Sequence, residues 1–122
     1  MKPYFIEATN HTPRVELTSN GEIVIKGKSL PEDTAKFYEP ILSWVNECCI
    51  DKIKFTLFLE YMNSSSANQI SKLLLLAKDN KQIKDCSIDW YYESDDEDNL
   101  DFGKELEMVT DFKFNFHECA EA

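Results

Sequence analysis

The sequence predicts a mixed α/β fold with the element order β-β-β-α-β-α-β-α-β. Three observations lead to it. The chain opens with strand-like segments joined by an Asn-Gly hairpin signal, and it continues by alternating strand and helix patterns, which implies parallel crossovers. With 122 residues and short connections, the chain is long enough for one core. We therefore expect one domain over residues 1–122, a mixed sheet that starts with an antiparallel hairpin, and helices packed on it.

The first quarter of the chain has the character of an antiparallel unit. Residues 4–8 and 14–18 are short and rich in aromatic or β-branched side chains, which is typical of strands. Asn20-Gly21 then indicates a tight turn, and residues 23–25 form the next strand, which we expect to end at Gly27.

A helix is expected to begin within residues 29–33, where Ser29 is a candidate N-cap and Pro31 suits a first turn. Apolar side chains then recur at helical spacing. The expected buried stripe of this helix is Phe37, Ile41, Trp44, Val45 and Cys48.

The middle of the chain gives a strand followed by a strongly periodic helix. Residues 53–60 alternate apolar and mostly polar side chains, as a strand with one covered face does. Residues 64–80 carry apolar side chains at helical spacing. Ser66 is the candidate N-cap of this helix, because Ser66 and Gln69 fit the spacing of a capping box.

The last third repeats the pattern more weakly. Residues 85–92 alternate as an interior strand, residues 100–109 favour a helix, and residues 112–116 alternate again as a final strand. The acidic run at residues 93–98 precedes the helix, and Ser94 with Glu97 fits a second capping box.

The charge of the chain excludes several classes of partner. Thirteen basic and twenty-three acidic side chains give 13 − 23 = −10, which repels nucleic acid and anionic membrane surfaces. No run approaches the roughly 20 apolar residues of a membrane span, and no signal peptide is evident, so we expect a cytoplasmic protein. The four cysteines lack metal-site or disulfide spacing and are expected to be reduced thiols.

Catalytic patterns find little support. The two histidines lie in no Ser/His/Asp or Cys/His arrangement, and the three glycines form no phosphate-binding loop. We expect no enzyme, no cofactor and no metal. A metal-dependent enzyme that uses Asp95, Asp96 and Asp98 is a weaker alternative, because carboxylates bind hard cations but this run lacks the spacing of a calcium loop.

Three consecutive hydroxyls are the feature most suggestive of function. Ser64, Ser65 and Ser66 open the second helix, where unpaired N–H groups and the helix dipole favour a phosphate. Helix capping by serine explains the same residues without a switch. Tyr61, Met62 and Tyr91 are candidates for a partner surface, since aromatic residues and methionine are enriched at interface cores.

Five separated motifs, in this order, resemble the SiaC family of bacterial regulatory phosphoproteins. They are Ile6-Glu7-Ala8-Thr9 with Thr12-Pro13, Ile25-Lys26-Gly27-Lys28-Ser29 with Pro31-Glu32, Phe37-Tyr38-Glu39-Pro40, Leu59-Glu60-Tyr61-Met62-Asn63-Ser64-Ser65-Ser66, and Trp90-Tyr91-Tyr92 with Asp95-Asp96-Glu97-Asp98.

The resemblance implies a STAS-like domain in which a hydroxyl at a helix start is phosphorylated by a cognate serine/threonine kinase and cleared by a phosphatase. It also implies that the unmodified form binds and activates a diguanylate cyclase or a similar signalling effector. The family's acceptor follows an asparagine in an Asn-Thr-Ser-Ser stretch, which corresponds to Ser64 here, with Ser65 and Ser66 as alternates. This chain has serine in place of that threonine, and Asn68 where a lysine is expected.

The expected partner-binding residues are those around this loop and the acidic run: Tyr61, Met62, Asn63, Tyr91, Asp95 and Asp96. The competing interpretation is a constitutive STAS-like scaffold in which Ser64 only caps its helix. Phosphorylation by a neighbouring kinase distinguishes the two.

Overall fold

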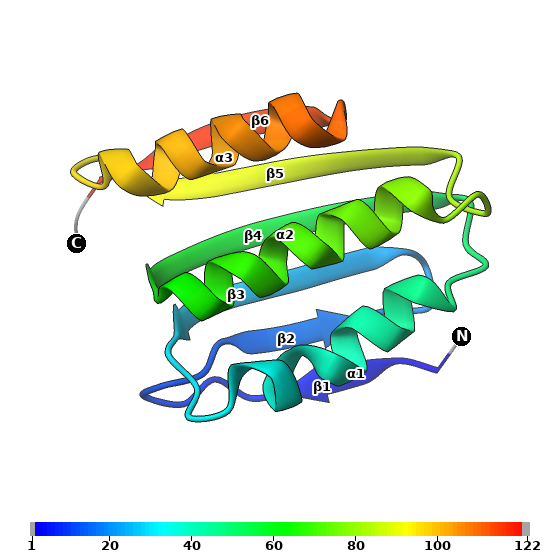
Figure 1. Cartoon of the computed structure of the whole chain (residues 1–122), viewed down its shortest axis with the longest axis horizontal. Coiled ribbons are helices and arrows are strands. Elements are labelled where there is room, and N and C mark those ends of the chain that lie inside the picture. The colour runs from blue at the N-terminus through cyan, green and yellow to red at the C-terminus, as the bar shows by residue number, and fades with distance from the viewer. Residues whose placement is uncertain (1, 121–122) are drawn as a thin grey trace.

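The computed structural model describes residues 2–120, which form six strands and three helices around one sheet (Figure 1). The strands are β1 (Tyr4–Ile6), β2 (Arg14–Leu17), β3 (Glu22–Ser29), β4 (Lys52–Met62), β5 (Asp85–Glu93) and β6 (Lys113–Cys119). The helices are α1 (Thr34–Asn46), α2 (Ser64–Asp79) and α3 (Glu97–Thr110). This confirms the expected element order and the mixed α/β class.

The strands lie in the sheet in the order in which they occur in the chain, from β1 to β6. β1, β2 and β3 pair antiparallel, whereas β3, β4, β5 and β6 pair parallel. Each parallel step is a crossover through one helix, and a fixed crossover hand places successive helices on the same side when the strand order keeps advancing. All three helices accordingly lie on one face of the sheet (Figure 1).

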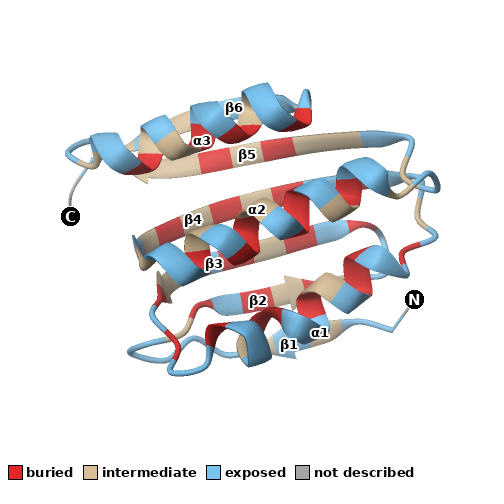
Figure 2. Ribbon diagram, in the orientation of Figure 1, coloured by how far each residue is buried: buried red, intermediate tan, exposed pale blue. Residues whose placement is uncertain are grey.

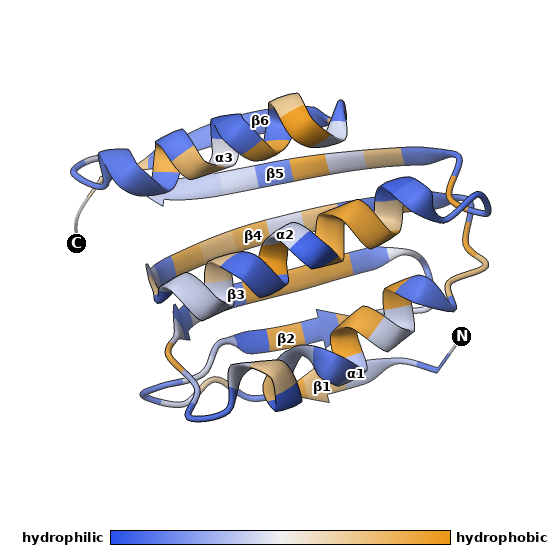
Figure 3. Cartoon of the chain, in the orientation of Figure 1, coloured by the Kyte–Doolittle hydropathy of each residue, from blue (hydrophilic) through white to orange (hydrophobic). Residues whose placement is uncertain are grey.

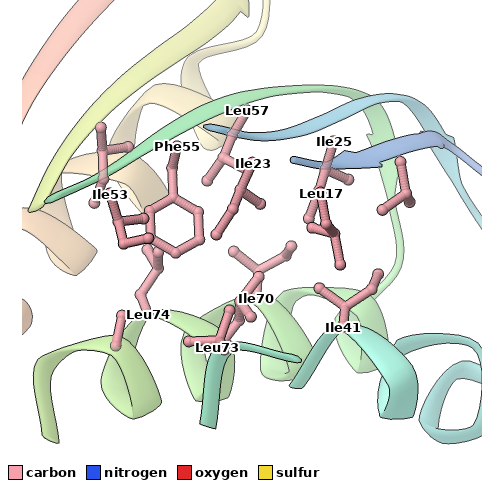
Figure 4. Close-up of a cluster of buried hydrophobic side chains, with 14 of the residues drawn as sticks. Leu17, Ile23, Ile25, Ile41, Ile53, Phe55, Leu57, Ile70, Leu73 and Leu74 are labelled. Carbon is pink, nitrogen blue, oxygen red and sulfur yellow. The ribbon is translucent and has the colours of Figure 1, made fainter. Parts of the chain in front are cut away.

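The core fills the space between the sheet and this helical layer. Alternate residues of β3 and β4 point toward the helices, and Ile23, Phe55 and Leu57 are at most 1% exposed. They face Ile41 of α1 and the apolar side chains of α2 (Figure 4). The same alternation appears as bands of buried residues along the central strands and as buried stripes on the helices (Figure 2).

The strand before α1 is longer than the sequence suggests. β3 does not stop at Gly27 but continues to Ser29, with an irregularity in its pairing with β4 between Gly27 and Lys28. Gly27 has φ of 126°, a backbone conformation that favours glycine, so it permits the irregularity instead of ending the strand. Ser29 is therefore the end of a strand and not a helix cap.

α2 begins at Ser64 as expected, whereas α1 begins at Thr34, just after the expected range, and the capping residues differ from those expected. The N-caps are Asp33 for α1, Asn63 for α2 and Asp96 for α3, each accepting a hydrogen bond from a backbone N–H three residues on. The capping roles expected for Ser66 and Ser94 are thus wrong. α3 also begins at Glu97, three residues before the expected start.

The second face of the sheet carries no helix in the described part of the chain (Figure 1). Apolar and polar residues alternate along the strands (Figure 3). The strand residues packed against the helices are the buried apolar ones. No helix among residues 2–120 has the length and apolar character needed to cross a bilayer.

Candidate functional site

The carboxyl ends of β3 and β4 and the amino termini of all three helices gather at one edge of the sheet (Figure 1). A cleft of about 420 Å³ lies there, and the end of β4, the first turn of α2 and the first turns of α3 line it. Of the residues singled out in the sequence, it brings together Tyr61, Met62, Asn63, Ser64 and Asp96.

Asn63 organises the start of α2. Its side-chain oxygen accepts the backbone N–H of Ser66 at 2.8 Å, and its carbonyl accepts the N–H of Ala67 at 3.0 Å. Asn63 is therefore the N-cap, and the three serines occupy the first three helical positions. Successive helical residues point in directions about 100° apart. The three hydroxyls consequently enter three different surroundings.

The Ser66 hydroxyl is part of the core. Ser66 and Ser29 are both fully buried, and the Ser66 hydroxyl accepts from Ser29 Oγ at 2.8 Å while donating to the Ser29 carbonyl at 2.9 Å. Because the Ser29 hydrogen goes to Ser66, Tyr38 is the donor in its 2.6 Å contact with Ser29 Oγ. Burial raises the pKa of Tyr38 to about 12, although hydrogen bonds to Ser29 and Ser66 oppose that rise, so its hydroxyl keeps the proton it donates.

The Ser65 hydroxyl links two helices at the surface. It donates to Asn63 Oδ1 at 3.1 Å and lies 3.0 Å from Thr34 Oγ1, at the first position of α1. Since Ser65 gives its hydrogen to Asn63, Thr34 is the donor in the second contact. Ser65 is exposed, but its hydroxyl already holds the starts of α1 and α2 together.

The Ser64 hydroxyl differs from both. Ser64 is exposed and lines the cleft, and within residues 2–120 its hydroxyl takes part in no hydrogen bond. A phosphoryl donor can reach this oxygen without breaking a contact. The geometry therefore gives different surroundings to three serines that the residue pattern alone, without the family resemblance, leaves equivalent.

The charged side chains that line the cleft are all acidic. Glu60, Asp96 and Asp98 line it, and the described residues contribute no lysine or arginine to its wall. A phosphate on Ser64 would gain from the amino terminus of α2 but would face these carboxylates, and the nearby ammonium of Lys28 lies over the ring of Tyr61, 5.5 Å from its centroid. The added charge would thus remain available to a partner.

The second half of the acidic run stabilises the start of α3. Asp96 Oδ1 accepts the N–H of Asn99 at 3.1 Å as the N-cap of α3, and Glu97 and Asp98 occupy the first turn, where the helix dipole favours acids. Across residues 2–120, no group of three or more His, Cys, Asp or Glu side chains is arranged to hold a metal ion.

Asn99 lies in the wall of the cleft, although the sequence did not single it out. Its side chain donates to the carbonyl of Leu59 at 2.9 Å and accepts from the indole of Trp90 at 3.0 Å, all in buried surroundings. It ties the start of α3 to the end of β4, which are the two walls of the cleft. An asparagine that directly follows an acidic run gives no sequence signal for these two hydrogen bonds.

Two of the expected partner-binding residues lie elsewhere. Tyr91 is on the open face of the sheet, where it stacks on His117 with ring centroids 4.5 Å apart. Asp95 is exposed in the turn before α3 and does not line the cleft. The sequence did not assign Ser29, Thr34 or Tyr38 to the site. Ser29 contacts Ser66, Thr34 contacts Ser65, and Tyr38 donates to Ser29.

Comparison with known proteins identifies a family and close structural relatives. The model of the SiaC family regulatory phosphoproteins matches residues 6–119. The structure of SiaC of Pseudomonas aeruginosa has a TM-score of 0.86 at 22% identity, covering 98% of this chain and 100% of that one. A chain in the crystal structure of the diguanylate cyclase SiaD in complex with its activator SiaC, from the same organism, has a TM-score of 0.85 at 23% identity, covering 95% and 99%. No curated protein sequence matches significantly.

Proposed function

Because the chain belongs to the SiaC family of regulatory phosphoproteins, we propose that it is a non-enzymatic switch whose binding to a signalling effector is controlled by phosphorylation of Ser64. A cognate serine/threonine kinase adds the phosphate and a phosphatase removes it. The effector is a diguanylate cyclase, by analogy with the structural relative that is named as an activator of such an enzyme. The switch operates in the cytoplasm.

The observation that carries the proposal is the difference between the three serine hydroxyls. Ser64 is exposed on the wall of a cleft and unbonded within the described residues, whereas Ser65 bridges two helix starts and Ser66 is buried. A kinase would have to open the end of α2 to reach Ser66. This contrast supports Ser64 as the acceptor and makes Ser65 and Ser66 structural residues.

The consequence of phosphorylation follows from charge. An added phosphate brings about −1.5 to −2 charges to a wall that already holds three carboxylates. A partner that covers Ser64 must then desolvate the phosphate or supply a cation to it. Without such a cation, dissociation is the outcome of lower free energy, so the unphosphorylated form is the binding form.

Two variants test the proposal against the alternative of a constitutive scaffold. Ser64→Asp should weaken binding to a purified diguanylate cyclase of the same organism that binds the wild-type protein, while Ser64→Ala should bind as the wild type does. Isothermal titration calorimetry measures both, with circular dichroism to verify folding. Equal affinities of the two folded variants would remove the switch, and no added mass after incubation with the organism's candidate serine/threonine kinases and ATP would favour the scaffold.

A further inference from the structure

The two edge strands of the sheet differ in length. β1, at one end of the strand order, has three residues, whereas β6, at the other end, has seven and pairs with β5 along all of them. The outer edge of β6 pairs with no strand among residues 2–120. Soluble proteins usually keep an open edge strand short or interrupt it with a bulge or a proline. β6 has none of these features, so its edge can accept a further strand.

One hydrogen bond shows which backbone groups of β6 face outward. The carbonyl of Cys119 accepts the N–H of Ser94, directly after β5, at 3.0 Å, so the backbone groups of Cys119 point toward β5. The N–H and C=O groups of one strand residue point to the same side, and those of the next residue point to the other side. Phe114, Phe116 and Glu118 therefore direct their N–H and C=O groups away from the sheet.

The side chains of β6 favour a second copy of the same strand as the occupant. Phe114 is buried and Phe116 half-buried, and their ring centroids lie 5.7 Å apart. In an antiparallel pair centred on Asn115, Phe114 of each copy lies opposite Phe116 of the other, and the two residues exchange both backbone hydrogen bonds. Aromatic residues that lie opposite each other form favourable cross-strand pairs. The aromatic core under α3 would then continue across the two-fold axis.

The position of α3 is compatible with this arrangement. A Cβ built on Gly103 would lie 2.8 Å from the indole of Trp90 on β5 and 3.0 Å from the ring of Phe116 on β6, so α3 lies over both strands (Figure 1). A helix midway between them would lie about 10 Å from its copy, which is two strand spacings. This is the usual distance between packed helices.

The charged side chains on the outer side of α3 are complementary between the copies. Helical spacing places Lys104 and Glu107 on the side of α3 that faces away from the cleft. α3 runs antiparallel to β6, and Gly103 lies level with Phe116. An axis at Asn115 therefore passes α3 about two residues after Gly103. Lys104 of each copy then lies opposite Glu107 of the other.

The charge of β6 itself does not oppose self-association. The strand carries one lysine and one glutamate, in a chain whose net charge is −10. Two copies that meet along β6 therefore bring together the part of the molecule where acidic and basic side chains are balanced, instead of two acidic surfaces.

We propose that two copies of this chain associate about a two-fold axis through antiparallel pairing of β6, which gives one continuous sheet with all the helices on the same face. This association goes beyond the proposed switch. α3 separates the edge of β6 from the cleft, so the pairing leaves Ser64 accessible. One strand pair and one helix pair form a small interface, so we expect a dissociation constant of about 10 μM.

Sedimentation equilibrium of the whole protein measures the association, and charge exchange tests the contact between helices. Lys104→Glu and Glu107→Lys each place like charges opposite each other twice across the axis, and each should raise the dissociation constant about tenfold. An equimolar mixture of the two variants restores both opposite-charge pairs and should dimerise as the wild type does. Lys72→Glu, at an exposed position of α2, is the matched control and should change the constant less than about twofold.

An engineered disulfide tests the register. Asn115 lies on the axis in a non-hydrogen-bonded pair, where Cα atoms about 4.5 Å apart are within reach of a disulfide. Asn115→Cys should therefore form a covalent dimer when diamide oxidises its two thiols, as seen in non-reducing electrophoresis. Lys113→Cys is the control on the same strand and face. Its two copies would lie roughly 14 Å apart, so it should form no more covalent dimer than the wild type with its native thiols.

Circular dichroism verifies that all variants are folded. A wild-type protein that stays monomeric up to about 1 mM overturns the proposal. A wild-type dimer that neither charge variant weakens also overturns it, as does a covalent dimer of Lys113→Cys in place of Asn115→Cys.

Discussion

At the scale of single residues, the main result is that identical side chains at consecutive positions have different roles. Ser64 lines the cleft, Ser65 joins α2 to α1, and Ser66 is buried against Ser29. The family resemblance points to Ser64 with Ser65 and Ser66 as alternates, but the residue pattern alone does not rank the three hydroxyls, because their surroundings are set by Asn63 as the N-cap and by strands distant in the chain.

Alanine substitutions should separate the structural serine from the accessible one. Ser66→Ala removes an acceptor from Ser29 Oγ and a donor from the Ser29 carbonyl, both buried, and should lower the free energy of unfolding by about 2 kcal/mol. Ser64→Ala loses no such bond and should change stability by less than about 0.5 kcal/mol. Urea denaturation of both variants measures this, and equal losses would contradict the assignment of roles.

A second residue-scale prediction concerns Asp89. Burial raises the pKa of its carboxyl, but hydrogen bonds from His117 and Lys54 outweigh burial and hold the pKa below the ordinary value of 3.8. A carboxyl with a depressed folded pKa stabilises the protein above the ordinary pKa, and this stabilisation is lost as pH falls through the folded value. Asp89→Asn should therefore cost about 1 kcal/mol at neutral pH.

Urea unfolding at pH 7, 5 and 3 checks the Asp89 prediction. The gap between wild type and Asp89→Asn should narrow between pH 5 and pH 3. A gap that stays constant down to pH 3 would mean that the ionised carboxylate contributes nothing and that the amide only packs less well.

At the scale of elements, sequence patterns located every strand and helix and the start of α2, but misplaced the starts of α1 and α3 and the residues that cap the helices. Asn, Asp and Ser are comparable N-cap residues, so a stretch that contains several of them gives several candidate starts. The structure selects Asp33, Asn63 and Asp96, where the preceding strand or loop delivers the chain to the helical layer. The predicted end of β3 was also wrong. A glycine in a strand pattern suggests that the strand ends, but Gly27 permits an irregular pairing with β4 and the strand continues.

The packing of α3 on β5 gives the prediction at this scale. Gly103 faces Trp90, and a Cβ built there would lie 2.8 Å from the indole, which is buried and cannot withdraw. Gly103→Ala should thus cost about 1–3 kcal/mol through overpacking, although alanine is intrinsically the better helix former by about 1 kcal/mol. Lys104→Ala is the exposed control in the same helix. A stabilised Gly103→Ala protein in thermal or urea unfolding would contradict this close approach.

At the scale of the whole molecule, the fold could be predicted because local periodicity and the strand-helix alternation agree with each other. The site could be predicted in part. Tyr61, Met62, Asn63 and Ser64 are continuous in sequence, so one edge of the sheet necessarily carries them together. Tyr91 could not be placed, because its neighbours on the open face come from strands whose registers are set by tertiary pairing.

The molecule presents two surfaces of different character. The cleft at the carboxyl edge of β4 holds the exposed Ser64 and an acidic wall. The open face of the sheet carries a hollow of about 420 Å³ that Arg14 and Lys26 line together with Phe58 and Tyr91. The proposed switch belongs to the first of these surfaces.

The most direct test of the central claim uses the phosphate itself. The protein is phosphorylated to completion by its cognate kinase, the modified residue is mapped by mass spectrometry, and both forms are titrated into the purified cyclase by calorimetry. We predict a single phosphate on Ser64 and an affinity at least about tenfold lower for the phosphorylated form. A phosphate on Ser65 or Ser66, or equal affinity of the two forms, would contradict the account.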